Sequence, residues 1–192
     1  LVASTSLRLL LEEARTVIRE SDADLDDART DLRSLAGRDA GALDAAHVRS
    51  AAVESLAENL ADGLVAPLFA FAVVASAVGS SLAVPIVALD SSIALPLAAG
   101  AAAWVKAVNT LDSMLGYRSK PIGWAAARLD DAVMWLPARL TALLLAVAAG
   151  SPTLPLRRRV RTLTRRPSSP NSGWPMATMA VLLSVRLHKP GA

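Results

Sequence analysis

Acidic side chains recur every fourth residue in the stretch 54–63, ESLAENLADG. Side chains four residues apart differ by only about 40° in their position around a helix, so Glu54, Glu58 and Asp62 share one face. Like charges at this spacing repel each other unless solvent, a cation or a ligand compensates. The face is either solvated at a membrane boundary or binds Mg²⁺ or a substrate amine through its carboxylate oxygens.

A second polar stripe lies in residues 108–120, VNTLDSMLGYRSK, at the end of an apolar run. Asn109, Asp112, Ser113 and Gly116 fall at positions i, i+3, i+4 and i+7 of a helix. Burying a carboxylate there is costly without a partner. A hydrogen-bonded seam between helices would explain the stripe, but its mixture of donors and acceptors favours a site.

A third cluster occupies residues 123–141, GWAAARLDDAVMWLPARLT, where Arg128, Asp131, Trp135 and Arg139 share a helix face. An arginine inside an apolar stretch is a functional candidate, and its guanidinium fork suits phosphate or carboxylate. The alternative is a salt bridge from Arg139 to Asp131 or Asp112. The segment 168–175, SSPNSGWP, adds a turn with Asn171, which is a weak signal by itself.

Several common catalytic arrangements are missing from the sequence. It has no cysteine and two histidines, which excludes thiolate nucleophiles, disulfides and histidine-rich metal sites. It also lacks the GxxxxGK[ST], GxGxxG, HExxH and GxSxG motifs. A bound nucleotide would therefore be held by a carboxylate-bound metal ion and arginines.

The elements that must position these residues are helices, many of them in a membrane. The chain has 192 residues, of which 53% are hydrophobic. Residues 63–89 form a run of 27 residues without a charge, longer than the roughly 20 that a membrane span needs. Shorter uncharged runs at 91–105, 140–156 and 170–185 predict three marginal spans.

Residues 1–62 are acidic, with 7 basic and 13 acidic side chains, and predict three helices outside the lipid. The first is amphipathic; Ser21 or Asp22 caps the second, Gly37 ends it, and the third runs from about Leu43 toward Asp62. The predicted fold is therefore all-α: a polytopic integral membrane helical bundle, residues 63–192, with an amphipathic N-terminal helical arm, residues 1–62.

The arginine-rich stretch 157–166 predicts a cytoplasmic loop under the positive-inside rule. The alternative is binding of anionic headgroups or nucleic acid, but an orientation signal is the preferred interpretation and no nucleic-acid partner is expected. For the motifs to meet on the cytoplasmic side, residues 132–156 must fold back or enter the membrane only partly. Labelling of cysteines introduced at Ser119 and Thr162 should then report the same side. Both ends of the chain suggest a piece of a longer protein.

Taken together, the four motifs and the segment 37–44, GRDAGALD, resemble the adenosylcobinamide-phosphate synthase family of cobalamin biosynthesis, known as CbiB or CobD. The resemblance implies a multi-pass cell-membrane ligase with a cytoplasmic active site. With ATP and Mg²⁺ as cofactors, it would join adenosylcobyric acid, a corrinoid, to (R)-1-amino-2-propanol or its phosphate. The lipid bilayer is an implied partner, and other membrane enzymes of the pathway could be partners too.

The resemblance also implies roles for the matching residues. Glu58, Asp62 and Asp112 would hold Mg²⁺, and Glu54 or Asp131 would accept the amine proton. Phosphate or corrin groups would be bound by Arg128 and Arg139 and by the amides of Asn59, Asn109 and Asn171.

Two other classes of membrane protein compete with the ligase. A transporter or channel subunit also places arginine and aspartate pairs inside the membrane. A CDP-alcohol phosphotransferase is rich in aspartates, but its DGxxAR motif fails here, since Asp62 and Gly63 are followed by Ala66 and Pro67.

Overall fold

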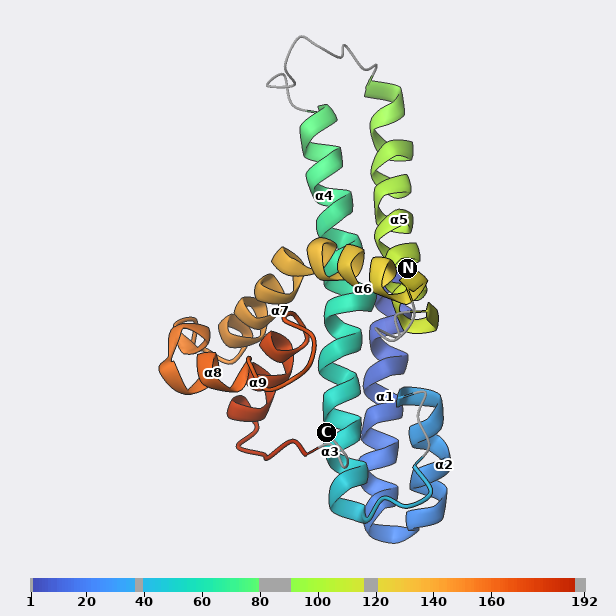
Figure 1. Cartoon of the computed structure of the whole chain (residues 1–192), viewed down its shortest axis with the longest axis vertical. Coiled ribbons are helices and arrows are strands. Elements are labelled where there is room, and N and C mark those ends of the chain that lie inside the picture. Colours follow the sequence, from blue (N-terminus) through green and yellow to red (C-terminus); the bar gives the residue numbers. More distant parts are fainter. Residues whose placement is uncertain (1, 37–39, 80–90, 116–120, 189–192) are drawn as a thin grey trace. The chain divides into compact units, whose positions relative to one another are not determined.

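The computed structural model describes residues 2–36, 40–79, 91–115 and 121–188, and every regular element in these ranges is a helix. The all-α prediction is confirmed for this part of the chain. The chain forms two compact units (Figure 1). Unit 1 comprises Leu1–Leu60 and Thr141–Ala192, and unit 2 comprises Ala61–Leu140. The predicted arm thus shares a unit with the C-terminal helices.

Three helices at the start of unit 1 pack around one apolar core: α1 (Val2–Ala23), α2 (Leu25–Ala36) and α3 (Ala45–Asn59). Val17, Leu32 and Val48, one from each helix, are fully buried in this core. Most charged residues of α1 and α2 face outward, as the amphipathic pattern predicts, whereas Glu20 and Arg29 are half-buried. The core belongs to unit 1 itself and needs no lipid.

The second helix is capped by a different residue from the two predicted. Asp24 Oδ1 accepts hydrogen bonds from the backbone N–H groups of Asp26 (3.0 Å) and Asp27 (3.3 Å). The hydroxyl of Ser21 cannot serve, because it lies inside α1 and donates to the Ile18 carbonyl at 2.7 Å. The prediction of Ser21 or Asp22 as the cap was therefore wrong; Gly37 lies outside the described residues.

Asp44 is the N-cap of α3, one residue beyond the predicted start. Its Oδ1 accepts from the backbone N–H of His47 at 2.9 Å and also contacts His47 Nδ1 at 2.7 Å. These bonds hold the pKa of the Asp44 carboxyl below its usual value, first through the backbone N–H and then through the side chain.

Replacing this cap predicts a pH-dependent loss of stability. Because the folded-state pKa is lowered, the cap stabilises above the unfolded-state value and its effect is lost as the pH falls through the folded-state value. Asp44→Ala should lower Tm by about 2–4 °C at pH 7, and by less below about pH 4, in thermal melts of helicity. Asp44→Asn keeps an acceptor and should melt near the parent. An equal Tm for all three proteins at pH 7 would contradict the cap.

The C-terminal part of unit 1 contains η3 (Leu154–Leu156), α8 (Arg158–Leu163) and α9 (Gly173–Leu182). A helix of 10 residues is only about 15 Å long, half the thickness of a bilayer core. The predicted span over 170–185 was therefore wrong. Its apolar residues serve a protein core instead: Met179 of α9 packs against Val53 and Ala57 of α3.

One long helix runs from Ala45 to Val78 and joins α3 to α4 (Ala66–Gly79) through a π-helical turn, η1 (Leu60–Val65). It is 34 residues long and is long and apolar enough to cross a membrane. Pro67 lies in the first turn of α4. A proline lacks the N–H that an α-helix needs, and the preceding wide turn, which already departs from the regular hydrogen-bond ladder, accommodates it.

Unit 2 is built on an antiparallel pair of helices, α4 and α5 (Ala94–Leu115), with η2 (Ser91–Ile93) leading into α5. Helix α6 (Pro121–Val133) packs against α5 and runs across the pair in Figure 1. The α4–α5 pair leaves large apolar side chains exposed, among them Leu68, Val73 and Trp104. Such a surface suits contact with lipid.

Helix α6 and α7 (Trp135–Ala148) pass the length and hydropathy criteria for a span only as a pair, bent by 48°. The described residues thus contain one clear candidate span, or two if the bent pair is counted. The multi-pass topology and the partial entry of residues 132–156 stay predictions. Ser119 lies outside the described residues.

Candidate active site

The centre of the candidate site is a hydrogen bond between the first two polar motifs. Asn109 Nδ2, on α5, donates to Asp62 Oδ2, on η1, at 3.1 Å. Asn109 is buried and Asp62 is half-buried, so the amide satisfies a carboxylate that is partly withdrawn from water. Two segments 47 residues apart in sequence therefore converge here.

More charged groups surround Asn109. Lys106 Nζ donates to Asn109 Oδ1 at 3.4 Å, which gives the amide a donor on one side and an acceptor on the other. Asp130 of α6 is within hydrogen-bonding reach of Asn109, and Asp112 acts electrostatically on the Asp130 carboxylate. We call Asp62, Lys106, Asn109, Asp112 and Asp130 the polar cluster; it combines one amide, one ammonium and three carboxylates.

The π-helical turn explains how Asp62 reaches this cluster. The four-residue spacing was predicted to place Glu54, Glu58 and Asp62 along one face of a regular helix. The wider turn at Leu60–Val65 changes the helical phase between the first two residues and the third. Glu54 is buried within unit 1 and accepts from Ser50 Oγ at 3.1 Å, whereas Asp62 bonds to Asn109 in unit 2.

The third motif contributes an exposed guanidinium on α6, the helix that also bears Asp130. Arg128 Nη1 lies 3.9 Å from Asp131 Oδ2, and the Arg128 guanidinium lies 5.8 Å from the centre of the Trp124 ring. The Arg128 side chain is 62% exposed, whereas that of Asp131 is 14% exposed. The Arg128 guanidinium is therefore accessible to a ligand, although its partner Asp131 is mostly buried.

Arg139 contacts Trp135 of its own helix, α7. Its guanidinium donates to the Trp135 carbonyl and lies 4.3 Å from the centre of the Trp135 ring. This contact is a cation–π interaction between two residues of one helix turn. The shared face predicted for Trp135 and Arg139 is confirmed, while a role for Arg139 in binding phosphate stays a prediction.

The remaining predicted residues, Glu54, Glu58, Asn59 and Asn171, belong to unit 1. Asn171 is buried in the turn before α9, where its carbonyl accepts from the Trp174 N–H at 3.0 Å. Glu58 and Asn59 are half-buried at the end of α3. Their proposed roles toward Mg²⁺, the amine proton or the substrate stay predictions.

The sequence reasoning did not select Lys106 or Asp130 for the site. Lys106 follows directly on the uncharged run 91–105, which was predicted as a marginal span. Asp130 and Asp131 are neighbours, and consecutive helical residues point about 100° apart, so only one of them can face α5 fully. The sequence does not show which of the two aspartates faces α5. In the described part of the chain, one Asp130 oxygen is buried without a hydrogen-bond partner.

The donor set suits a hard cation but does not form a complete cage for one. Among the described residues, no group of three or more histidine, aspartate or glutamate side chains is arranged to hold a metal ion. Mg²⁺ usually takes only one or two protein carboxylates and completes its shell with water and substrate phosphates. The buried Asp130 oxygen and the neighbouring Asp112 fit this incomplete kind of site.

Fold and site together define the class: a helical protein in which a charged polar cluster lies on helices that also expose large apolar side chains. Comparison with known proteins gives the family. The family model described as CobD/CbiB protein matches residues 1–192, so the chain belongs to the CobD/CbiB family of cobalamin biosynthesis proteins. No solved structure shows a significant match to the chain.

Curated relatives agree with this family. The cobalamin biosynthesis protein CobD of Rhodobacter capsulatus is 43% identical over 174 residues, covering 87% of this chain and 46% of the relative. CobD of Klebsiella pneumoniae is 40% identical over 95% of this chain and 52% of its own. CbiB of Salmonella choleraesuis is 38% identical over 98% of this chain and 53% of its own. The chain thus spans about half the length of these relatives.

Proposed function

We propose that the protein containing this chain is an ATP-dependent ligase. It would join the ring D propionate of adenosylcobyric acid to (R)-1-amino-2-propanol or to its phosphate. The Asp62–Asn109 hydrogen bond carries the proposal, because it unites two of the motifs that resemble the family into one polar cluster. Membership of a cobalamin biosynthesis family supports the choice of pathway.

The reaction needs two bond-forming steps. An oxygen of the propionate attacks the γ-phosphorus of ATP, and ADP leaves, which gives an acyl phosphate. The amine nitrogen then attacks the acyl carbon, phosphate leaves, and the nitrogen loses a proton. Positive charge must be placed near the phosphates and a base near the amine.

The described residues can supply these groups. Two of the three carboxylates of Asp62, Asp112 and Asp130 would hold a Mg²⁺ ion, which would neutralise phosphate charge. Arg128 is exposed enough to bind phosphate or a corrin carboxylate in the bidentate manner of a guanidinium. Asp131 would accept the amine proton.

The same proposal places the enzyme in the cell membrane, as a multi-pass protein with the site on the cytoplasmic side, where ATP is available. The helix Ala45–Val78 supports a membrane location. A corrinoid, an aminopropanol and the lipid bilayer are the expected partners.

Mass spectrometry of a defined mixture tests the function. Full-length protein is incubated with adenosylcobyric acid, ATP, Mg²⁺ and either amine, and the expected product mass is that of adenosylcobinamide or its phosphate. Product without added ATP, or substrate flux through proteoliposomes without ATP turnover, would contradict the ligase and favour a transporter.

Two substitutions are expected to lower product formation in that assay. Asp112→Asn removes a negative charge from the polar cluster, and Arg128→Ala removes the exposed guanidinium. Each should slow product formation at least about tenfold, the size of one lost charged hydrogen bond. Met114→Leu, at an exposed position of the same helix as Asp112, is the matched control. Parent-like rates for both variants would remove these residues from the site.

A further inference from the structure

Helix α6 has its apolar side outward and its carboxylates inward. Asp130 and Asp131 are half-buried. Within residues 123–133, the exposed side chains are mainly apolar: Trp124, Ala125, Arg128, Leu129 and Ala132. A helix on a water-facing surface shows the opposite arrangement, with its apolar residues against the core. The outward face of α6 therefore suits surroundings that are less polar than water.

The exposed apolar face continues into the first turn of α7. Trp124 and Trp135 are each 55% exposed, and Leu129 and Leu136 are exposed beside them in sequence. A contiguous apolar surface of this kind marks an interaction site. Tryptophan gathers at membrane–water interfaces, because its ring has an apolar body and a polar N–H that fit the level of the lipid headgroups.

Each of these two tryptophans is followed by an arginine four residues later. The Arg128 guanidinium lies 5.8 Å from the centre of the Trp124 ring, and the Arg139 guanidinium lies 4.3 Å from the centre of the Trp135 ring. A long basic side chain covers apolar surface with its stem and keeps its charge near water or lipid phosphates. The repeated pair therefore suits the boundary between acyl chains and headgroups.

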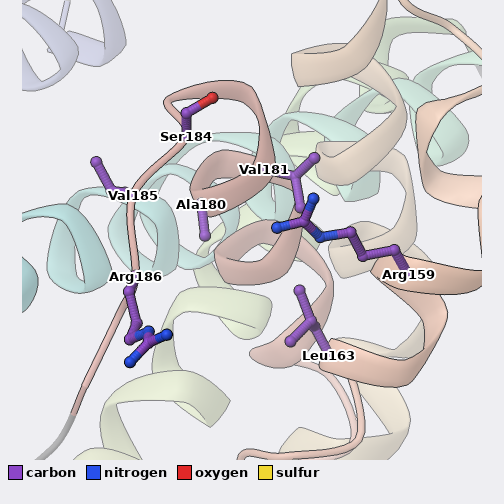
Figure 2. Close-up of a pocket in the computed structure, with 7 residues that line it drawn as sticks. All are labelled: Arg159, Leu163, Ala180, Val181, Ser184, Val185 and Arg186. Atoms are coloured by element: carbon purple, nitrogen blue, oxygen red, sulfur yellow. The ribbon is translucent and has the colours of Figure 1, made fainter.

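Other exposed arginines of the chain lack this arrangement. Figure 2 shows Arg159 and Arg186 pointing in different directions around a cavity of about 320 Å³ at the end of α9. No aromatic ring lines that cavity. The stacking of a guanidinium on an indole is thus a particular property of α6 and α7 and not a general property of exposed arginines in this protein.

Helix α6 meets the α4–α5 pair where the polarity of the pair changes. Met134, directly after α6, packs with Ala66 of α4 and Val105 of α5. Neither α4 nor the part of α5 up to Val105 contains a charged residue. On the other side of these contacts lie Asp62, which precedes Ala66, and Asn109, which follows Val105. A membrane–water boundary produces such a change along a pair of helices.

The length and direction of α6 favour a position along the membrane surface. Its 13 residues extend about 20 Å, whereas the acyl core of a bilayer is about 30 Å thick. A bend of 48° separates it from α7. Figure 1 shows that α6 runs across the α4–α5 pair and not along it. An amphipathic helix that runs across membrane helices lies in the plane of the interface.

We propose that α6 is an interfacial helix whose outward face, together with Trp135 and Leu136, lies in the headgroup layer of the bilayer. The indole rings then face the acyl chains, and the guanidinium groups face lipid phosphates. This inference rests on the membrane location given with the proposed function. It goes further, because it places the carboxylates on the inner side of α6 at the lipid boundary, where ATP and a water-soluble amine arrive without crossing acyl chains.

The test is site-directed spin labelling of the full-length protein in nanodiscs of phosphatidylcholine. The described chain has no cysteine, and any cysteine elsewhere in the protein is replaced by serine. Nitroxides are attached in turn to the variants Ala125→Cys, Leu129→Cys and Ala132→Cys, which lie on one face of α6. The accessibility of each nitroxide to oxygen and to a water-soluble nickel complex gives its depth in the bilayer.

The three labels should lie near the headgroups, at depths that agree within about 5 Å. A helix that crosses the membrane would separate the labels at 125 and 132 by about 10 Å, which would overturn the proposal. High nickel accessibility at all three would place the face in water, and low accessibility to both reagents would show that protein covers it. Either result would also overturn the proposal.

A label on Val73→Cys, at an exposed position of α4, distinguishes failure of this inference from failure of the membrane location. That label should be deep in the acyl chains, with high oxygen and low nickel accessibility. A deep label there with α6 labels in water would overturn the interfacial helix alone. A Val73 label in water would overturn the membrane location, and the interfacial helix with it.

The contribution of the tryptophans is tested with the Ala132→Cys label. Trp124→Ala should raise the nickel accessibility of this label about twofold, because the indole no longer holds α6 at the headgroups. Trp104→Ala is the matched control: Trp104 is 53% exposed, similar to Trp124, but lies on α5. It should leave the accessibility unchanged. An equal change from both substitutions would show that Trp124 does not anchor α6.

Discussion

Asn109→Asp is expected to reduce product formation at least about 100-fold in full-length protein, the largest catalytic effect of any single substitution considered for the polar cluster. The change replaces the Nδ2 donor with an oxygen, so that two acceptors face each other across the 3.1 Å contact with Asp62. It also adds a fourth carboxylate beside Asp112 and Asp130. The side chain hardly changes in size, so packing is preserved while the charge balance is lost.

The pH dependence of this variant separates lost charge balance from simple misfolding. When the introduced carboxyl takes a proton, it can again donate to Asp62 and no longer adds charge. The activity of the variant relative to the parent should therefore rise as the pH is lowered. A misfolded protein would show no such recovery.

Thr110→Val is the matched control for Asn109→Asp. Thr110 is the next residue of α5 and is exposed, and its hydroxyl donates to the Lys106 carbonyl of the same helix at 2.8 Å. Its replacement should leave product formation near the parent rate. A parent-like rate for Asn109→Asp, with both proteins equally helical, would show that the Asp62–Asn109 contact has no part in the reaction.

The polar cluster illustrates what sequence patterns determine in this protein. Spacing predicted the shared faces of Arg128 with Asp131 and of Trp135 with Arg139, because these pairs lie within one helix turn. The contact between Asp62 and Asn109 depends on a π-helical turn and on the pairing of α4 with α5. Local spacing contains no information on either.

The apolar run at 170–185 is a case in which the sequence pattern led to a wrong prediction. Hydrophobicity alone cannot distinguish a membrane span from a helix buried in protein, because both exclude water from the same side chains. The structure places Thr178 and Pro175 of this run among fully buried residues, and α9 ends after 10 residues. Gly173 and Pro175 near its start were the available sign of a shorter element.

Gly173→Ala is expected to produce the largest loss of stability. A Cβ atom at this position would overlap the Thr164 carbonyl oxygen and lie 2.7 Å from its carbon. Both are backbone atoms, so no rotation of a side chain can relieve the clash, and α9 would have to move away from the end of α8. We expect a loss of about 3 kcal/mol and a Tm lower by roughly 6–12 °C in thermal melts of helicity.

Gly100→Ala is the matched control for this prediction, because the same added methyl group meets nothing within 4 Å on α5. Alanine also favours a helix interior over glycine by about 1 kcal/mol, so this variant should melt at or above the parent Tm. Equal Tm values for Gly173→Ala and the parent would show that α8 and α9 do not approach each other as closely as described. The difference between the two variants thus measures the backbone contact itself, and it would explain why the SPNSGWP segment has a glycine where its helix begins.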